Sequence, residues 1–265
     1  MSFDPRLPRD DVNASKTHPL ADAWWLVIGA AAAGLALTVL ALAFAELAAR
    51  WLPASLEARL FGGLLEAAGD HPRGPAARDL LARLASHWPE NPYELRLSVL
   101  DEEGPNAFAM PGGSITVTRG LLEQVESENE LAFVLGHEVG HFAGRDHLQA
   151  IGRALALSLA LGAVFGSIGA ETVPTIASDL ASRGYDRGQE RAADRFGLAL
   201  VAQEYGHVAG AGRFFARLPD AKARLGDRAA AWFATHPVSE QRIDALHAHA
   251  RKRGWLPDGP LTPLP

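Results

Sequence analysis

Two histidines separated by one helical turn constrain this chain more than any other feature of its sequence. The motif HExxH, formed by His137, Glu138 and His141, lies inside the stretch Leu131–His147. Residues four apart share one face of an α-helix, so the two imidazoles can bind one metal ion. Glu138 then lies beside the open coordination position of that ion. The alternative is an ordinary helix that carries two unrelated histidines.

Both ends of this helix are marked in the sequence. Ser127 is a suitable N-cap, and Glu130 completes a capping box three residues later. The apolar run 131–135 then leads into the motif, as expected for a helix buried in a core. We interpret Arg145–His147 as a network that caps the C-terminal end.

Charge and cysteine content narrow the possible functions. The formal net charge is −6, and no excess of basic residues is available to neutralise phosphates, so we expect no nucleic-acid partner. The sequence contains no cysteine, which excludes disulfides and thiolate metal sites. Any metal ion must therefore be held by histidines and carboxylates.

A long uncharged stretch near the N-terminus predicts a membrane anchor. Ala23–Ala45 has 23 residues, more than the roughly 20 needed to span a bilayer as a helix. Tryptophans bracket it like an interfacial belt: Trp24, Trp25 and Trp51. We expect a disordered tail over 1–20 and one transmembrane helix within 21–50. A buried core helix is the alternative, and a cleaved signal peptide fits poorly because the apolar core is too long and starts late.

The charges that flank the anchor suggest its orientation. Arg6, Arg9 and Lys16 precede the stretch, whereas Arg50 and Arg59 follow it closely. The positive-inside rule then favours a cytoplasmic N-terminus. The rest of the chain would lie outside the cytoplasm, in the periplasm if the membrane is a bacterial inner membrane.

The middle of the chain indicates a few short strands. Tyr93–Leu100 alternates in part between apolar and polar residues, Asn106–Met110 is a short extended piece, and Ser114–Thr118 follows the turn Pro111–Gly113. Helical patterns dominate elsewhere. We therefore expect a mainly helical α+β domain with a small antiparallel β-sheet.

A second uncharged stretch, Ala154–Ala170, follows the HExxH helix. At ~1.5 Å per residue it reaches about 25 Å, which is short of the ~30 Å hydrocarbon core. A single crossing would also place Glu190 and His141 on opposite sides of the membrane. We therefore interpret this segment as a buried or membrane-skimming piece.

The helix predicted over 185–203 carries a second carboxylate pair. Glu190 and Asp194 lie four residues apart and share a face. Glu190 is the leading candidate for a third metal ligand, and Asp194 can accept the outer N–H of a ligating histidine. The alternative for Glu190 is a solvated charge paired with Arg187 or Arg191.

These residues together suit hydrolysis. Glu138 would take the proton of a zinc-bound water and pass it to the leaving amine. His236 is a candidate donor to the developing oxyanion, but a reversible fourth ligand or a plain surface histidine are open alternatives. Arg187 and Arg242 are further donors or structural residues.

Four motifs in order now resemble a known family: NAFAMPGGSITVTRGLL at 106–122, HExxH at 137–141, YDRGQERAAD at 185–194, and THP with Arg242 at 235–242. The chain resembles the membrane-associated zinc metallopeptidases that include the CAAX prenyl protease, HtpX, OMA and BepA. The chain also departs from the family. Asp186 stands where the family usually has Ser before Arg187, and the four-span layout of HtpX is missing, because one span is convincing. The repeat domain that follows the protease domain in BepA has no counterpart.

The resemblance implies a gluzincin-like fold with one zinc ion on His137, His141 and Glu190 and with Glu138 catalytic. It also implies an extended peptide substrate that pairs with the segment at 106–110: Asn106, Ala107, Phe108, Ala109 and Met110. In periplasmic relatives the histidine that matches His236 can approach the metal and regulate access.

We therefore expect a metallopeptidase domain over 55–252 and a C-terminal tail over 253–265. The predicted function is a zinc endopeptidase anchored in membrane lipid and acting in envelope protein quality control. The alternative is a metal-binding membrane scaffold or chaperone without proteolytic activity. Intact Glu138 speaks against the alternative, because a scaffold needs no base.

Overall fold

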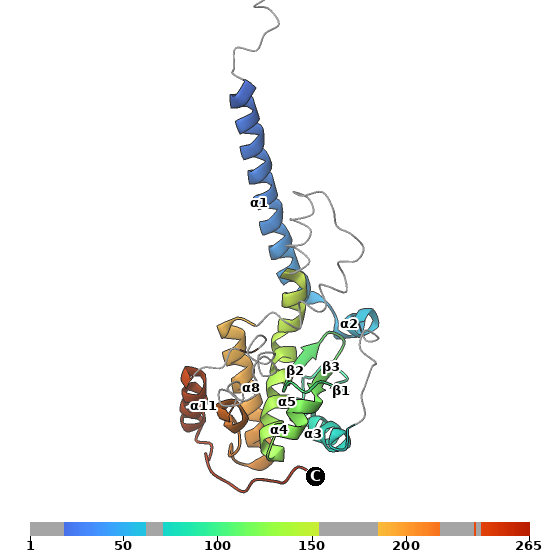
Figure 1. The fold of residues 1–265 in the computed structure, drawn as a ribbon, viewed down its shortest axis with the longest axis vertical. Coiled ribbons are helices and arrows are strands. Elements are labelled where there is room, and N and C mark those ends of the chain that lie inside the picture. Colours follow the sequence, from blue (N-terminus) through green and yellow to red (C-terminus); the bar gives the residue numbers. More distant parts are fainter. Residues whose placement is uncertain (1–18, 62–70, 154–184, 218–235, 237–239) are drawn as a thin grey trace, which may run out of the picture.

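A single long helix projects from a domain built around two neighbouring helices and a small sheet (Figure 1). The computed structural model describes residues 19–61, 71–153, 185–217, 236 and 240–265. Of the tail predicted over 1–20, residues 1–18 lie outside the described part, as does the uncharged stretch 154–170, while residues 19 and 20 belong to a helix. The predicted architecture, mainly helical with a small sheet, is confirmed.

Helix α1, Pro19–Trp51, forms the projection. Its stretch Asp22–Phe44 is long and apolar enough to cross a membrane, by length and composition, and no other helix in the described part of the chain is. None of this stretch is buried, which argues against the alternative of a core helix. The short helix α2, Ala54–Phe61, follows and leads into the domain.

The sheet contains three strands: β1 (Arg96–Leu100), β2 (Ala107–Met110) and β3 (Ser114–Thr118). Their order is β1-β3-β2. β2 pairs with β3 antiparallel, but β1 pairs with β3 parallel, so the prediction of an antiparallel sheet was wrong for β1.

The connections explain this mixed sheet. β2 and β3 form a hairpin whose turn uses Gly112 and Gly113, both with a positive φ of 87°. β2 lies along one edge of β3, and β1 lies along the opposite edge. The loop at 101–106 therefore crosses from β1, past β3, to β2. Alternation of apolar residues predicts a strand but not the direction of its partner.

Two helices, one before and one after the strands in the sequence, pack against the sheet. Helix α3, Gly74–Ser86, buries the stripe Leu80, Leu81 and Leu84 that its helical spacing predicts. Helix α4, Arg119–Gln124, begins at Thr118, whose hydroxyl accepts the N–H of Leu121.

Helix α5, Glu128–Gly144, is the centre of the domain and lies between α8 and the sheet (Figure 1). The hydroxyl of Ser127 accepts the N–H of Glu130, as predicted. The Glu130 carboxylate instead accepts from the N–H of Glu126, one residue before the N-cap. The helix ends at Arg145, which has a left-handed backbone with φ of 55°.

Helix α8, Arg187–Tyr205, starts from a complete capping box. The Asp186 carboxylate accepts the N–H groups of Gly188 and Gln189, while the Gln189 side chain accepts the N–H of Asp186. Asp186 thus caps the helix, as the Ser usual in the family could. Gly206 ends the helix in the left-handed conformation.

Helices α5 and α8 touch through their backbones. A Cβ atom on Gly197 would lie 2.6 Å from the His137 amide nitrogen, and one on Gly140 would lie 2.7 Å from Ala193 Cα. Gly136 and Gly140 are four residues apart on α5, as Ala193 and Gly197 are on α8, so small residues meet along one line. Because the two helices are this close, the N-terminal turn of α8 lies beside the HExxH motif.

The C-terminal part of the chain returns to the start of α5. After helix α11, Glu240–Arg253, the Thr262 carbonyl accepts the N–H of Glu128, and the Thr262 N–H donates to the Asn129 side chain, both at 2.8 Å. Leu264 is buried in the core. The segment predicted as a tail therefore packs on the domain, whereas the predicted domain limits stay predictions.

We expect Gly197→Ala to lower the melting temperature and the zinc content together. The added methyl group must separate two packed backbones, which costs about 1–3 kcal/mol and moves the α8 carboxylates away from α5. Thermal unfolding and elemental analysis measure both effects. Ala192→Ser, at an exposed position of the same helix, is the control, and full zinc content in Gly197→Ala would contradict the packing argument.

Candidate metal centre

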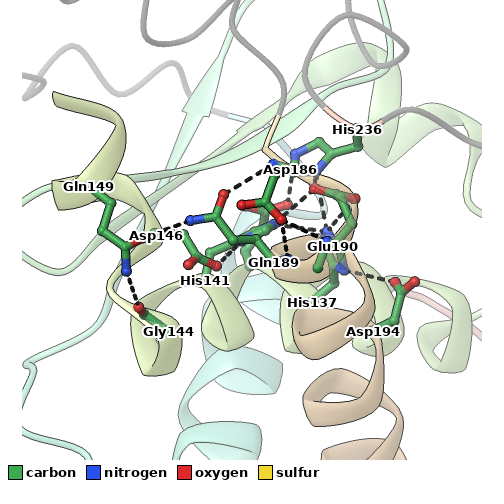
Figure 2. A network of polar contacts seen from close by, with 12 residues as sticks. His137, His141, Gly144, Asp146, Gln149, Asp186, Gln189, Glu190, Asp194 and His236 are labelled. Carbon is green, nitrogen blue, oxygen red and sulfur yellow. Dashed lines mark hydrogen bonds and ion pairs between the residues drawn. The ribbon is translucent and has the colours of Figure 1, made fainter. Parts of the chain in front are cut away.

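Three elements bring four metal-binding side chains together: His137 and His141 from α5, Glu190 from α8, and His236 (Figure 2). One potential ligand atom from each lies within 4.8 Å of all the others. All four side chains are buried, with Glu190 the most exposed at 3%. The predicted third ligand thus lies beside the two imidazoles, although its role as a ligand stays a prediction.

The two imidazoles of α5 face one another as their spacing predicts. The Nε2 atoms of His137 and His141 are 3.1 Å apart. One Glu190 oxygen lies 3.4 Å from His141 Nε2, and the other lies 3.6 Å from His137 Nε2. These lone pairs converge on a single point, which is the arrangement that a cation stabilises.

A carboxylate holds the far side of each ring. Asp194 lies 3.0 Å from Nδ1 of His137, and Asp146 lies 2.8 Å from Nδ1 of His141. A proton held at Nδ1 leaves the Nε2 lone pair for a metal ion. The sequence indicated Asp194 but not Asp146, which was interpreted as part of a helix cap. A carboxylate five residues after the second histidine, where the helix ends, was the available signal.

Arg242 binds the two carboxylates of α8 instead of facing a substrate. Its Nε and Nη2 lie 2.6 and 2.7 Å from the two oxygens of Asp194, and its Nη1 lies 2.5 Å from Glu190. Such a two-pronged pair is well suited to a buried site. This geometry supports the structural alternative for Arg242. Arg187, the other predicted donor, has an exposed side chain.

The buried charges leave room for a dication. Four buried carboxylates surround the imidazoles, those of Glu138, Asp146, Glu190 and Asp194, and the guanidinium of Arg242 pairs with the last two. Uncompensated charges in a protein interior are costly. A divalent metal ion would balance them, so the donor set fits such an ion.

The protonation equilibria respond to this excess of negative charge. Burial lowers the pKa of His141, but hydrogen bonds to Asp146 and Glu190 raise it to about 9. Burial would raise the pKa of Glu190, yet the nearby histidines His236 and His137 hold it well below its usual range. The carboxylates thus favour the charged form of His141, and the imidazoles favour the charged form of Glu190, whereas burial lowers the pKa of His137.

Glu138 also lies in this centre, and its carboxylate has no hydrogen-bond partner among the described residues. Its side chain is fully buried, and neither carboxylate oxygen accepts a hydrogen bond from any described residue. His236 Nε2 lies 3.4 Å from its Oε1. A buried carboxylate that holds nothing in place is costly for folding, which is typical of a residue kept for chemistry.

His236 turns its other nitrogen toward the metal-binding atoms. Its Nδ1 lies 3.0 Å from Glu190 Oε1 and 3.2 Å from His137 Nε2. This placement does not fit a plain surface histidine. It is the placement that the fourth-ligand alternative requires.

Further contacts tie the two helices together around the centre (Figure 2). Gln149 donates to the carbonyl of Gly144 and accepts from Gln189 at the start of α8. Tyr185, just before that helix, stacks on the His141 ring with centroids 3.7 Å apart. Sequence reasoning missed these partners, because none lies at a helical spacing from the ligands.

The predicted peptide-binding segment lies on the sheet edge beside α5. Asn106, Ala107 and Ala109 are buried, whereas Phe108 and Met110 are half-buried. β2 pairs with β3 along one side, and no other described strand covers its second side.

Comparison with known proteins identifies the family. Residues 77–250 match peptidase family M48. The chain belongs to this family. The matched region includes α5, α8, His236 and the sheet edge formed by β2. The family is a peptidase family, which agrees with the resemblance seen in the motifs.

The curated relatives that the chain matches are named as proteases. The chain is 28% identical over 190 residues to the mitochondrial metalloendopeptidase OMA1 of Schizosaccharomyces pombe, covering 71% of this chain and 54% of the relative. It is 31% identical to the metalloprotease LoiP of Escherichia coli, covering 53% and 57%. It is 25% identical to the beta-barrel assembly-enhancing protease of Escherichia coli, covering 64% and 37%. The chain thus spans between about a third and just over half of the length of these relatives.

We expect Asp146→Asn and Asp194→Asn each to weaken zinc binding about 10- to 100-fold, because each removes the carboxylate that orients a ligating imidazole. Competition with a chromophoric chelator measures the affinity. Asp101→Asn, which changes an exposed carboxylate in the loop after β1, is the control. Unchanged affinity in Asp146→Asn would mean that the carboxylate missed by sequence reasoning does not support the site.

Proposed function

We propose that this protein is a membrane-anchored zinc endopeptidase. The observation that carries the proposal is the meeting of His137, His141 and Glu190 next to a buried Glu138 that accepts no hydrogen bond from the described residues. Membership in family M48 supports the same reading. A binding site without catalysis would not need that carboxylate.

Zinc fits the donor set best. Two imidazoles and one carboxylate are typical of catalytic zinc sites, which keep one position open. The sequence contains no cysteine that could compete as a ligand. When bound, zinc would polarise the scissile carbonyl and make the attacking water more acidic. We propose one ion per chain.

Glu138 would move the protons of the reaction. Its two oxygens are buried and accept no hydrogen bond within the described part of the chain, so one can accept a proton from the attacking water. The same oxygen can then donate that proton to the leaving amine. Asp194 and Asp146 would keep the two imidazoles in the required tautomer throughout.

His236 would control access to the centre. With Nδ1 3.0 Å from Glu190 and Nε2 3.4 Å from Glu138, it occupies space that substrate and water need. We propose that it acts as a reversible fourth ligand and moves aside when substrate binds. Once displaced, it could donate to the oxyanion, which was its first predicted role.

An extended peptide would bind along β2. The Asn106 carbonyl accepts the N–H of Thr118, and the Asn106 N–H donates to the Thr118 hydroxyl. By the alternation of antiparallel ladders, the backbone groups of Ala107 and Ala109 then point toward the uncovered edge. The Ala107 N–H already donates to the Asn106 side chain, so Ala109 is the position that would pair with a substrate. A substrate strand could pair there beside α5, in the sheet-edge mode of recognition.

The anchor suggests where such substrates occur. Helix α1 would hold the domain next to a lipid bilayer, and the flanking charges favour the extracytoplasmic side of a bacterial inner membrane. One relative is named a beta-barrel assembly-enhancing protease, and others are mitochondrial metalloendopeptidases. We propose proteolytic quality control of envelope proteins as the role.

We expect Glu138→Gln to abolish cleavage of casein by the detergent-solubilised full chain while zinc content stays at the wild-type level. The amide cannot accept the proton from water, but it does not remove a ligand. Gel analysis of cleavage and elemental analysis give the two values, and a chelator should stop wild-type cleavage.

Glu126→Gln, an exposed position just before the same helix, is the control for this experiment and should cleave normally. Cleavage by Glu138→Gln at the wild-type rate would refute the mechanism. Zinc binding without any wild-type cleavage would favour the scaffold or chaperone alternative.

We expect Ala109→Pro to reduce peptide cleavage at least tenfold, mainly through KM, with unchanged zinc content. Proline removes an outward N–H, and an edge strand tolerates this loss better than a central one. Steady-state kinetics with a peptide substrate measure the effect. Ala109→Ser keeps the N–H and should retain activity, whereas normal KM in Ala109→Pro would exclude edge pairing at this residue.

A further inference from the structure

A fully buried carboxylate outside the metal centre lies in the short helix that follows the membrane anchor. Glu57 of α2 is 0% exposed. Its oxygen Oε1 lies 2.8 Å from His147 Nε2 and accepts the Gly112 N–H at 2.9 Å. Its oxygen Oε2 accepts the Tyr93 hydroxyl at 3.2 Å and lies 3.3 Å from Arg145 Nη2.

These donors come from both sides of the proposed active site. Arg145 and His147 directly follow α5, whereas Gly112 belongs to the turn that joins β2, the peptide-binding edge, to β3. Arg145 also donates to the carbonyl of Leu52, just after α1. The juxtamembrane residues 52–57 therefore contact the end of the metal-binding helix and the end of the substrate strand.

The contact with α5 continues to a metal ligand. Asp146, which lies between the two residues bound to Glu57, is 2.8 Å from Nδ1 of His141. The turn that carries Asp146 is tight, because Arg145 has a positive φ of 55° and a Cβ on Gly144 would meet the Asp146 carboxylate at 2.9 Å. Fixing Arg145 and His147 therefore fixes the position of Asp146.

We propose that Glu57 is a positioning residue through which the juxtamembrane segment holds Asp146, and hence His141, in the geometry that retains the metal ion. The proposal rests on the proposed zinc site. It makes the anchor helix and its linker part of the active-site support and not merely a tether. His141 then depends on a side chain in the helix that follows the membrane anchor, through a contact between residues 90 positions apart in the sequence.

The chemistry of Glu57 agrees with such a role. Burial raises the pKa of this carboxyl, but His147, Gly112 and Tyr93 together hold it below its ordinary value, so Glu57 is charged at neutral pH. A buried charge of this kind stabilises a fold no better than well-packed apolar residues would, whereas it specifies one geometry for its donors. A purely structural pin is the competing explanation, and the experiment separates the two.

The test measures zinc affinity and apo-protein stability in the same full-length chain in detergent. Glu57→Gln puts an NH2 group against the donors of Arg145 or His147. Glu90→Gln makes the same change at an exposed carboxylate and is the control. We expect Glu57→Gln to weaken zinc binding about tenfold in chelator competition, as outer partners of metal ligands do. The control should bind as wild type.

A double-mutant cycle tests the route. In the Asp146→Asn background, Glu57→Gln should cause little further loss of zinc affinity, because the residue through which it acts is already altered. If Glu57→Gln does not fold, His147→Ala and His147→Gln replace it. We expect His147→Ala to lose affinity and His147→Gln, which returns an N–H, to regain most of it.

Several outcomes would overturn the proposal. A lower melting temperature of the metal-free Glu57→Gln protein with wild-type zinc affinity would show a structural pin only. Fully additive losses in the cycle would exclude the route through Asp146. Failure of the wild-type chain itself to bind zinc would instead refute the proposed function, and the inference with it.

Discussion

The metal centre depends on direct contact between the backbones of α5 and α8. Gly136 and Gly140 face Ala193 and Gly197, with no side chain large enough to keep the helices apart. Histidine and glutamate side chains are short, so they converge on one point only when their helices are this close. The capping box at Asp186 fixes where α8 begins, and therefore which carboxylate lies opposite the imidazoles.

Charge is the second constraint. It explains why the potential metal ligands are surrounded by successive shells of charged partners. Asp194 and Asp146 contact the outer nitrogens of the two imidazoles, and Arg242 pairs with Asp194 and Glu190. Glu57 contacts the turn that carries Asp146. Each shell compensates charges that would otherwise be unpaired in the interior. A centre of this kind resists small displacements, because moving one member leaves a neighbour without its partner.

The features encoded locally could be predicted from the sequence. Ser127, the HExxH spacing and the pair Glu190 and Asp194 each act over one or two helical turns. The parallel pairing of β1 with β3, the link from Asp146 to His141 and the burial of Glu57 could not be predicted in this way. They depend on which distant segments meet, and residues 145–147 have the composition of an ordinary helix end.

The length of α1 has a consequence for how such an enzyme would select its targets. Its apolar stretch ends at Phe44, but the helix continues to Trp51, seven residues or about 10 Å further along its axis. With that stretch in lipid, a stiff spacer would set the height of the catalytic cleft above the bilayer surface. Cleavage would then be governed by reach, favouring unfolded chain segments close to the membrane over loops that extend far from it.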